Sequence, residues 1–139
     1  MRRMVKTLTG LAALLVLLLV GQTAPARAGA IEVEIFYLPH RPAQVVVDKV
    51  EQVAAEFKNV VVRKYSFEDR DTGKLLKKYQ LTDHMPVAII INGRDSFTVA
   101  GRTLRLRNFP KGDAFVPMFA GEWDYADLRA ILAGLDGGK

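Results

Sequence analysis

Apolar and polar residues follow one another along the chain in a pattern that predicts alternating strands and helices. Residues 31–38 (IEVEIFYL) begin with apolar and acidic residues in alternation and then become apolar on both faces, as in a strand that enters a covered sheet. From Pro42 to about residue 58, apolar residues recur at spacings of three and four, which predicts an amphipathic helix. Residues 60–65 begin with three valines and predict a second strand, parallel to the first.

The second half of the chain continues this alternation with a helix, a buried strand, a hairpin, a long loop and a closing helix. The buried strand ends at Asn92-Gly93, a hairpin signal, so the next apolar segment is expected to return against it. No repeat and no long linker divides the chain into domains. The predicted segments are 69–79 (helix), 87–91 (strand), 97–99 (returning strand), 101–108 (its continuation or another strand, with Arg102, Arg105 and Arg107 on an exposed face), 109–121 (loop) and 123–135 (helix).

The first 28 residues have the pattern of a secretory signal peptide. Three basic residues precede an apolar run over 8–20, and an Ala-Arg-Ala sequence ends at residue 28. The apolar run is short for a membrane span. We therefore expect a signal peptide over 1–28 and one domain over 29–139 that is periplasmic or secreted. The alternative is an uncleaved signal anchor that tethers the domain to the membrane.

Loss of the signal segment would change the charge of the protein. The whole chain has a formal net charge of +5, from 20 Lys and Arg against 15 Asp and Glu. The signal segment holds basic residues and no acidic ones, so the rest of the chain is nearly neutral and gives no reason to expect nucleic acid or anionic lipid as a partner. The chain has no cysteine, so stability in an oxidising compartment must come from the apolar core.

Two segments carry a family resemblance. In the first, Phe36-Tyr37 precedes the quartet Arg41-Pro42-Ala43-Gln44 at the junction of the predicted strand and helix. The second runs from Lys78-Tyr79 through Met85-Pro86 to Asn92-Gly93. Together with the order of the elements, these segments resemble the thioredoxin-like family, in which a C-x-x-C motif stands at that junction, five residues after an aromatic pair.

The resemblance covers nearly all of residues 29–139. It implies an α/β fold with a central mixed sheet of four to five strands and flanking helices. In that family the proline that matches Pro86 is cis and faces the active-site turn, so the resemblance implies a cis Met85–Pro86 bond. The chain departs from the family at Ile35, where thioredoxins often carry a buried acid, and in the greater length of residues 101–121.

The missing cysteines exclude the usual reaction of the family. Thiol–disulfide exchange needs a thiolate, which no residue of this chain can supply. The sequence also lacks a nucleophile-elbow serine, a Gly-rich phosphate loop and an HExxH metal motif. We therefore expect a redox-inactive protein that is not an enzyme, with no catalytic residue, no cofactor and no metal ligand.

The two histidines allow a second interpretation. If the fold is thioredoxin-like, His40 and His84 lie on one surface with Met85 between them. Imidazole and thioether ligands suit copper in an oxidising compartment, but three such ligands are few for a metal site. A recognition surface that responds to pH is the favoured alternative, because histidine titrates near neutrality.

The first of three candidate functions is a binding module. In the thioredoxin-like family the backbone of the residue before the proline pairs with an extended substrate segment, and this β-augmentation needs no sulfur. Arg41 stands at a helix N-terminus, so it either contacts an anion or acidic peptide or extends into water. The expected partner is a protein or extended peptide of the cell envelope, without nucleic acid and without membrane insertion after signal cleavage. The expected partner-binding residues are Pro39, His40, Arg41, Pro42, Gln44, His84, Met85 and Pro86.

The other two candidates are a structural subunit or accessory factor of an envelope complex, docking through residues 109–121, and an enzyme with a non-thiol or metal-dependent mechanism. The apolar residues of this region either form an exposed docking patch or fold back over the core, which is the commoner arrangement. An open surface from Arg41 to Met85 would favour the binding module. An exposed apolar patch would favour the structural subunit. The residues of that patch would be Phe115, Val116, Met118, Phe119 and Trp123.

Overall fold

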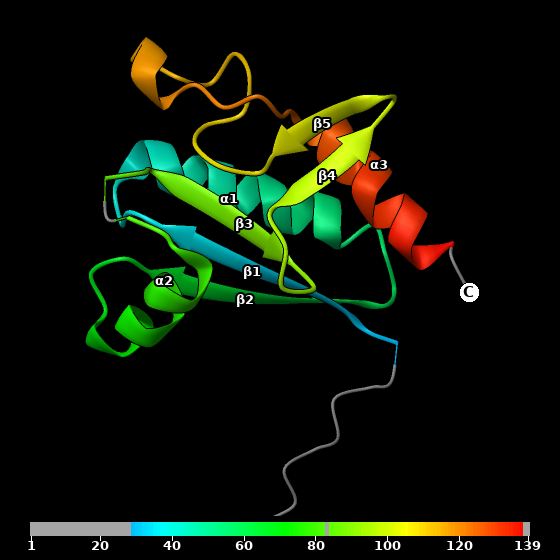
Figure 1. Ribbon diagram of the computed structural model, residues 1–139, viewed down its shortest axis with the longest axis horizontal. Helices are drawn as coiled ribbons and strands as arrows, with labels where there is room; N and C mark the ends of the chain where they lie inside the picture. The colour runs from blue at the N-terminus through cyan, green and yellow to red at the C-terminus, as the bar shows by residue number, and fades with distance from the viewer. Residues whose placement is uncertain (1–28, 83, 138–139) are drawn as a thin grey trace, which may run out of the picture.

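The computed structural model describes residues 29–82 and 84–137 (Figure 1). The expected signal peptide, residues 1–28, lies outside the described residues. Within the described ranges, no helix has the length and apolar character needed to cross a membrane. The elements are β1 (Ile31–Tyr37), α1 (Arg41–Ala54), β2 (Val60–Ser66), the 3-10 turn η1 (Arg70–Thr72), α2 (Gly73–Tyr79), β3 (Val87–Ile91), β4 (Ser96–Val99), β5 (Arg102–Arg105), the 3-10 turn η2 (Pro117–Phe119) and α3 (Tyr125–Asp136).

Strand β1 lies at the centre of a three-stranded mixed sheet. Strand β2 pairs with it in parallel on one side and β3 pairs with it antiparallel on the other. The crossover through α1 allows the parallel pairing. The mixed α/β class is therefore as predicted. The sheet is smaller than the expected four to five strands, because β4 and β5 pair with each other in a separate two-stranded sheet.

The chain leaves β3 through the predicted turn but does not return where expected. Asn92 and Gly93 have φ values of 48° and 79°, and Ile91 and Arg94 form an antiparallel bridge across them. The next strand, β4, pairs with β5, so the expected return of residues 97–99 against β3 is wrong. The segment after β5 runs along β3 instead: the Asn108 N–H donates to the Val87 carbonyl at 2.8 Å. Phe97 and Val99 of β4 are half-buried and pack against the main core.

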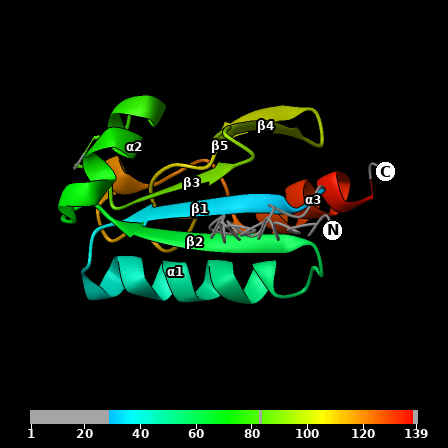
Figure 2. The ribbon, with the colours of Figure 1, turned by 90° about the horizontal axis from the view of Figure 1, so that it is seen from below.

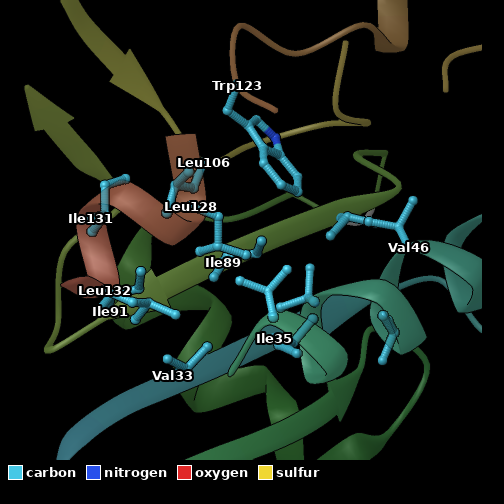
Figure 3. Close-up of a cluster of buried hydrophobic side chains, with 14 of the residues drawn as sticks. Val33, Ile35, Val46, Ile89, Ile91, Leu106, Trp123, Leu128, Ile131 and Leu132 are labelled. Atoms are coloured by element: carbon cyan, nitrogen blue, oxygen red, sulfur yellow. The ribbon is translucent and has the colours of Figure 1, made fainter. Parts of the chain in front are cut away.

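The main core lies between one face of the sheet and the helices α1 and α3, and α2 covers part of the opposite face (Figure 2). Figure 3 shows Trp123, fully buried, pointing into the main core, where the side chains come from β1, β3, α1, α3 and the segment after β5. The residues labelled there are Val33, Ile35, Val46, Ile89, Ile91, Leu106, Trp123, Leu128, Ile131 and Leu132.

Both long helices begin with recognisable start signals. Helix α1 carries Pro42 in its first turn, as predicted, since the missing N–H there has no helical partner. It ends at Ala54, a turn earlier than the apolar pattern indicated. Helix α3 begins with a capping box, in which the Asp127 N–H donates to Asp124 Oδ1 at 2.8 Å and the Asp124 N–H donates to Asp127 Oδ2 at 3.1 Å.

Two of the three arginines expected on an exposed strand face are engaged in ion pairs. Arg107 pairs with Asp95 and donates to the Tyr79 carbonyl at 3.2 Å, which connects the base of the β4–β5 hairpin to the end of α2. Arg102 pairs with the buried Asp127 at 2.9 Å. Arg102 and Arg105 are both exposed, so the expectation of an exposed face holds for these two residues, whereas Arg107 is half-buried.

Candidate binding groove

An open groove of about 550 Å³ lies between the first half of α1 and the loop 109–121. This volume is within the range of sites that bind small molecules or peptide side chains. Its lining is mainly apolar, with charged groups at intervals. The lining residues are Arg41, Pro42, Val45, Val46, Lys49, Gly112, Asp113, Ala114 and Phe115.

Helix α1 forms one wall of the groove mainly through residues that lie outside its buried stripe. Arg41, Val45 and Lys49 are spaced four apart, which places them on one face of the helix. The buried residues, such as Val46 and Val50, face the core. Val45 is 42% exposed, so this wall presents an apolar side chain to solvent between two basic ones.

The loop that forms the other wall is closed at its base. The Phe109 N–H donates to the Phe119 carbonyl at 2.9 Å, and the Gly121 N–H donates to the Phe109 carbonyl at 2.7 Å. Phe109 and Trp123 are buried, and Trp123 Nε1 donates to the Asn108 carbonyl at 3.2 Å. The loop is therefore a compact unit with joined ends.

A cluster of three side chains attaches the loop to both helices. Asp113 Oδ2 accepts from Lys49 Nζ of α1 at 3.3 Å and from the Tyr125 hydroxyl of α3 at 3.0 Å. The Lys49 ammonium also lies 5.3 Å from the centre of the Tyr125 ring. Burial raises the pKa of the Tyr125 hydroxyl well above its usual range, and the hydrogen bond to Asp113 adds to the shift. These contacts hold residues 112–115 in place beside α1.

The tip of the loop exposes apolar side chains next to the groove. Phe115 is 83% exposed and Met118 74%, and Val116 is also exposed. Phe119 is half-buried and Trp123 is buried, so these two fold back over the core. The apolar residues of this region thus divide between the two arrangements considered from the sequence, and three of them are exposed at the tip of the loop.

The segment around Pro86 does not have the expected geometry. Residues 29–82 and 84–137 contain no cis peptide bond, so the Met85–Pro86 bond is trans and the expected cis bond is wrong. Trans is the ordinary state of an X–Pro bond, and the expectation of cis came from the family resemblance alone. Pro86 is buried, and its carbonyl accepts from the Leu38 N–H at 3.0 Å. Met85 packs among the apolar side chains beneath α2.

The other expected binding residues lie in different surroundings. Pro39 and His40 are exposed at the junction of β1 and α1, and Gln44 donates to Asp48 at 3.5 Å. Arg41 and Pro42 line the groove beside α1. His84 lines a separate hollow formed with Phe67, Leu76 and other residues beside α2. The structure therefore places Arg41 and Pro42 with the loop 109–121 rather than with His84.

Some groove residues gave no clear signal in the sequence. Val45 is an apolar residue one position outside the buried stripe of α1, and this offset is a signal that a helical projection reveals. The contacts of Asp113 with Lys49 and Tyr125 are tertiary and have no counterpart in the sequence pattern. Residues 29–82 and 84–137 hold no group of three or more His, Asp or Glu placed to bind a metal.

Comparison with known proteins finds no matching family model and no significant similarity to a curated protein or a solved structure. Of the charged side chains that line the groove, Lys49 and Asp113 are paired with each other, and Asp113 also accepts from the Tyr125 hydroxyl of α3.

Proposed function

We propose that this protein is a redox-inactive binding module of the thioredoxin-like type, which binds a protein or peptide partner in the groove between α1 and residues 112–115. The order of the elements supports the thioredoxin-like assignment, as do the β2-β1-β3 arrangement and the helices on both faces of the sheet. The absence of cysteine supports a role without thiol chemistry.

One observation carries the proposal: an open groove lies between α1 and a loop that is fixed in place, and each wall presents an exposed apolar side chain, Val45 or Phe115. Contiguous apolar surface on a soluble protein marks an interaction site. Phe115 and Met118 are held by the closed base of the loop and by the Asp113 contacts, so their exposure is a property of the folded structure. A pre-organised patch of this kind loses little conformational entropy on binding.

We further propose that the protein acts outside the cytoplasm. The basic, apolar and small-residue pattern over 1–28 supports export to the periplasm or secretion, with a membrane-tethered form as the alternative. The partner would then be a protein or peptide of the cell envelope. The nearly neutral charge of residues 29–139 supports a polypeptide over nucleic acid.

A matched pair of valine variants tests the site. Val45 on the groove wall and Val61 on β2 are each 42% exposed, so Val45→Ser and Val61→Ser remove the same amount of exposed apolar surface at two places. We expect Val45→Ser and Phe115→Ser to lose partners captured from envelope extracts, and Val61→Ser to retain them.

Mapping on the protein completes this test. Titration with the captured partner should perturb backbone amide signals of residues 41–49 and 112–118. Perturbations centred on residues 84–86 would return the site to the segment before Pro86, and perturbations on β2 alone would refute the proposal.

A structural role in an envelope complex is the second candidate, and the exposed tip of the loop favours it. Phe115, Val116 and Met118 would then be permanently covered by another subunit. Permanent interfaces are large and apolar, whereas peptide binding is reversible. A partner that co-purifies at fixed stoichiometry through gel filtration would support the structural role, and rapid exchange would support the binding module.

A further inference from the structure

The charged side chains that line the groove differ in whether they are paired with an opposite charge among the described residues. Lys49 and Asp113 form an ion pair with 3.3 Å between Nζ and Oδ2. Arg41 also lines the groove and is exposed, and it makes no ion pair or hydrogen bond through its side chain with any of residues 29–82 and 84–137. The groove therefore has a neutral end at Lys49 and a positive end at Arg41.

The surroundings of Arg41 increase this positive charge. Arg41 is the first residue of α1, where the helix dipole is positive. The first turn of α1 contains no acidic residue, and the side chain of the N-cap residue His40 makes no capping hydrogen bond. A carboxylate supplied by a partner would complement both the guanidinium and the helix terminus.

The apolar part of the groove lies one helical turn from this charge. Val45 is four positions after Arg41, which is about 6 Å along the helix axis. An extended peptide advances about 3.3 Å per residue, and its side chains at positions i and i+2 lie on the same side. An acidic side chain at Arg41 and an apolar side chain between Val45 and Phe115 would therefore be two residues apart.

We infer that the groove binds an extended peptide segment in which an acidic residue is two positions from a bulky apolar residue. This inference rests on the proposed binding function and adds the chemistry of the partner. The bulky side chain lies against Pro42, Val45 and Phe115, and the carboxylate pairs with Arg41. The end of the segment near Lys49 and Asp113 is uncharged, because that ion pair is already complete.

Three labelled peptides provide the test. Each is a short, otherwise neutral peptide that contains Asp-Gly-Phe, Asn-Gly-Phe or Lys-Gly-Phe. We expect the protein to bind the Asp peptide about two- to fivefold more tightly than the Asn peptide, as for a solvent-exposed ion pair. The Lys peptide should bind most weakly. The preference should shrink in 0.5 M salt, because exposed charges are then strongly screened.

Two charge-reversed variants separate a local effect from a general one. Arg41→Glu should reverse the order of the Asp and Lys peptides, and it should fold because an acidic residue suits the first turn of a helix. Arg105→Glu makes the same change of charge at an exposed residue of β5 that has no ion pair with other described residues. This control should keep the wild-type order.

The outcomes distinguish the inference from the proposed function. If the three peptides bind the wild-type protein equally, or if Arg41→Glu keeps the wild-type order, the inferred chemistry is wrong and the groove can still bind a partner of another kind. If no peptide binds and Val45→Ser captures the same partners as the wild type, both the inference and the proposed function are wrong.

Discussion

Replacing Gly121 with alanine tests how tightly the loop 109–121 is closed. A Cβ at this position would lie 2.4 Å from the Arg107 carbonyl oxygen and 2.7 Å from the Phe109 carbonyl oxygen. Both are backbone atoms, so neither can move aside like the end of a flexible side chain. The Phe109 carbonyl also accepts the Gly121 N–H at 2.7 Å, and separating the two segments would lengthen this hydrogen bond.

The expected cost combines overpacking with weakened hydrogen bonding. Overpacking a filled site costs about 1–3 kcal/mol and a lost hydrogen bond about 1 kcal/mol. Gly121→Ala should therefore lower the free energy of unfolding by about 2–4 kcal/mol, a large part of the stability of a single domain. Urea denaturation followed by circular dichroism measures this change, and amide exchange at Phe109 and Gly121 should become faster.

A second glycine provides the matched control. Gly134 lies inside α3, and a Cβ there would meet nothing within 4 Å. Gly134→Ala should therefore stabilise the protein by about 0.5–1 kcal/mol, because alanine restricts the unfolded chain and favours the helix. If Gly121→Ala proves as stable as the wild type, with unchanged exchange at Phe109 and Gly121, the described closure of the loop is incorrect.

Three further predictions follow from burial and exposure. Trp123→Ala should lower the free energy of unfolding by about 3–5 kcal/mol in urea titrations, because it empties the space of a fully buried side chain. A loss of less than about 1 kcal/mol would contradict this packing. The raised pKa of Tyr125 contributes stability that is present below the unfolded pKa of about 10 and is lost as the pH rises through the higher folded pKa. The urea midpoint of Tyr125→Phe should therefore fall less at alkaline pH than that of the wild type. Equal falls in the two proteins would refute the assignment. Phe115→Ser should change the free energy of unfolding by less than about 0.5 kcal/mol, because the ring is exposed, while it reduces partner capture. A strong destabilisation would show instead that the ring is packed against the protein.

The sequence predicts most of the helices and strands, though not the size of the sheet, because its strongest patterns are local. The alternation in β1, the apolar run of β3 and the helical period of α1 each identify an element without knowledge of its neighbours. The expected return of residues 97–99 along β3 is wrong, because the Asn92-Gly93 turn specifies a reversal and does not specify which later segment pairs with the strand. In the structure β4 pairs with β5, and the backbone of Leu106 and Asn108 bonds to β3.

The groove was predicted only in part. Arg41 and Pro42 are expected at a binding surface because they stand in the quartet that matches the family's C-x-x-C motif, and both line the groove. The choice of Met85 as a binding residue followed from an expected cis bond that the structure does not have. Lys49, Asp113 and Tyr125 come together through tertiary contacts between α1, the loop and α3, and a single sequence carries no pattern for such contacts.

The way in which α3 completes the main core has a consequence for synthesis. Leu128 and Leu132 of α3, together with Trp123, belong to one core with side chains of β1 and α1 that are made roughly 70 to 100 residues earlier. A nascent chain that ends before Trp123 has α1 to cover part of the inner face of the sheet, but it lacks the core side chains of Trp123, Leu128 and Leu132. We expect the rest of that apolar face to stay exposed until α3 has been made.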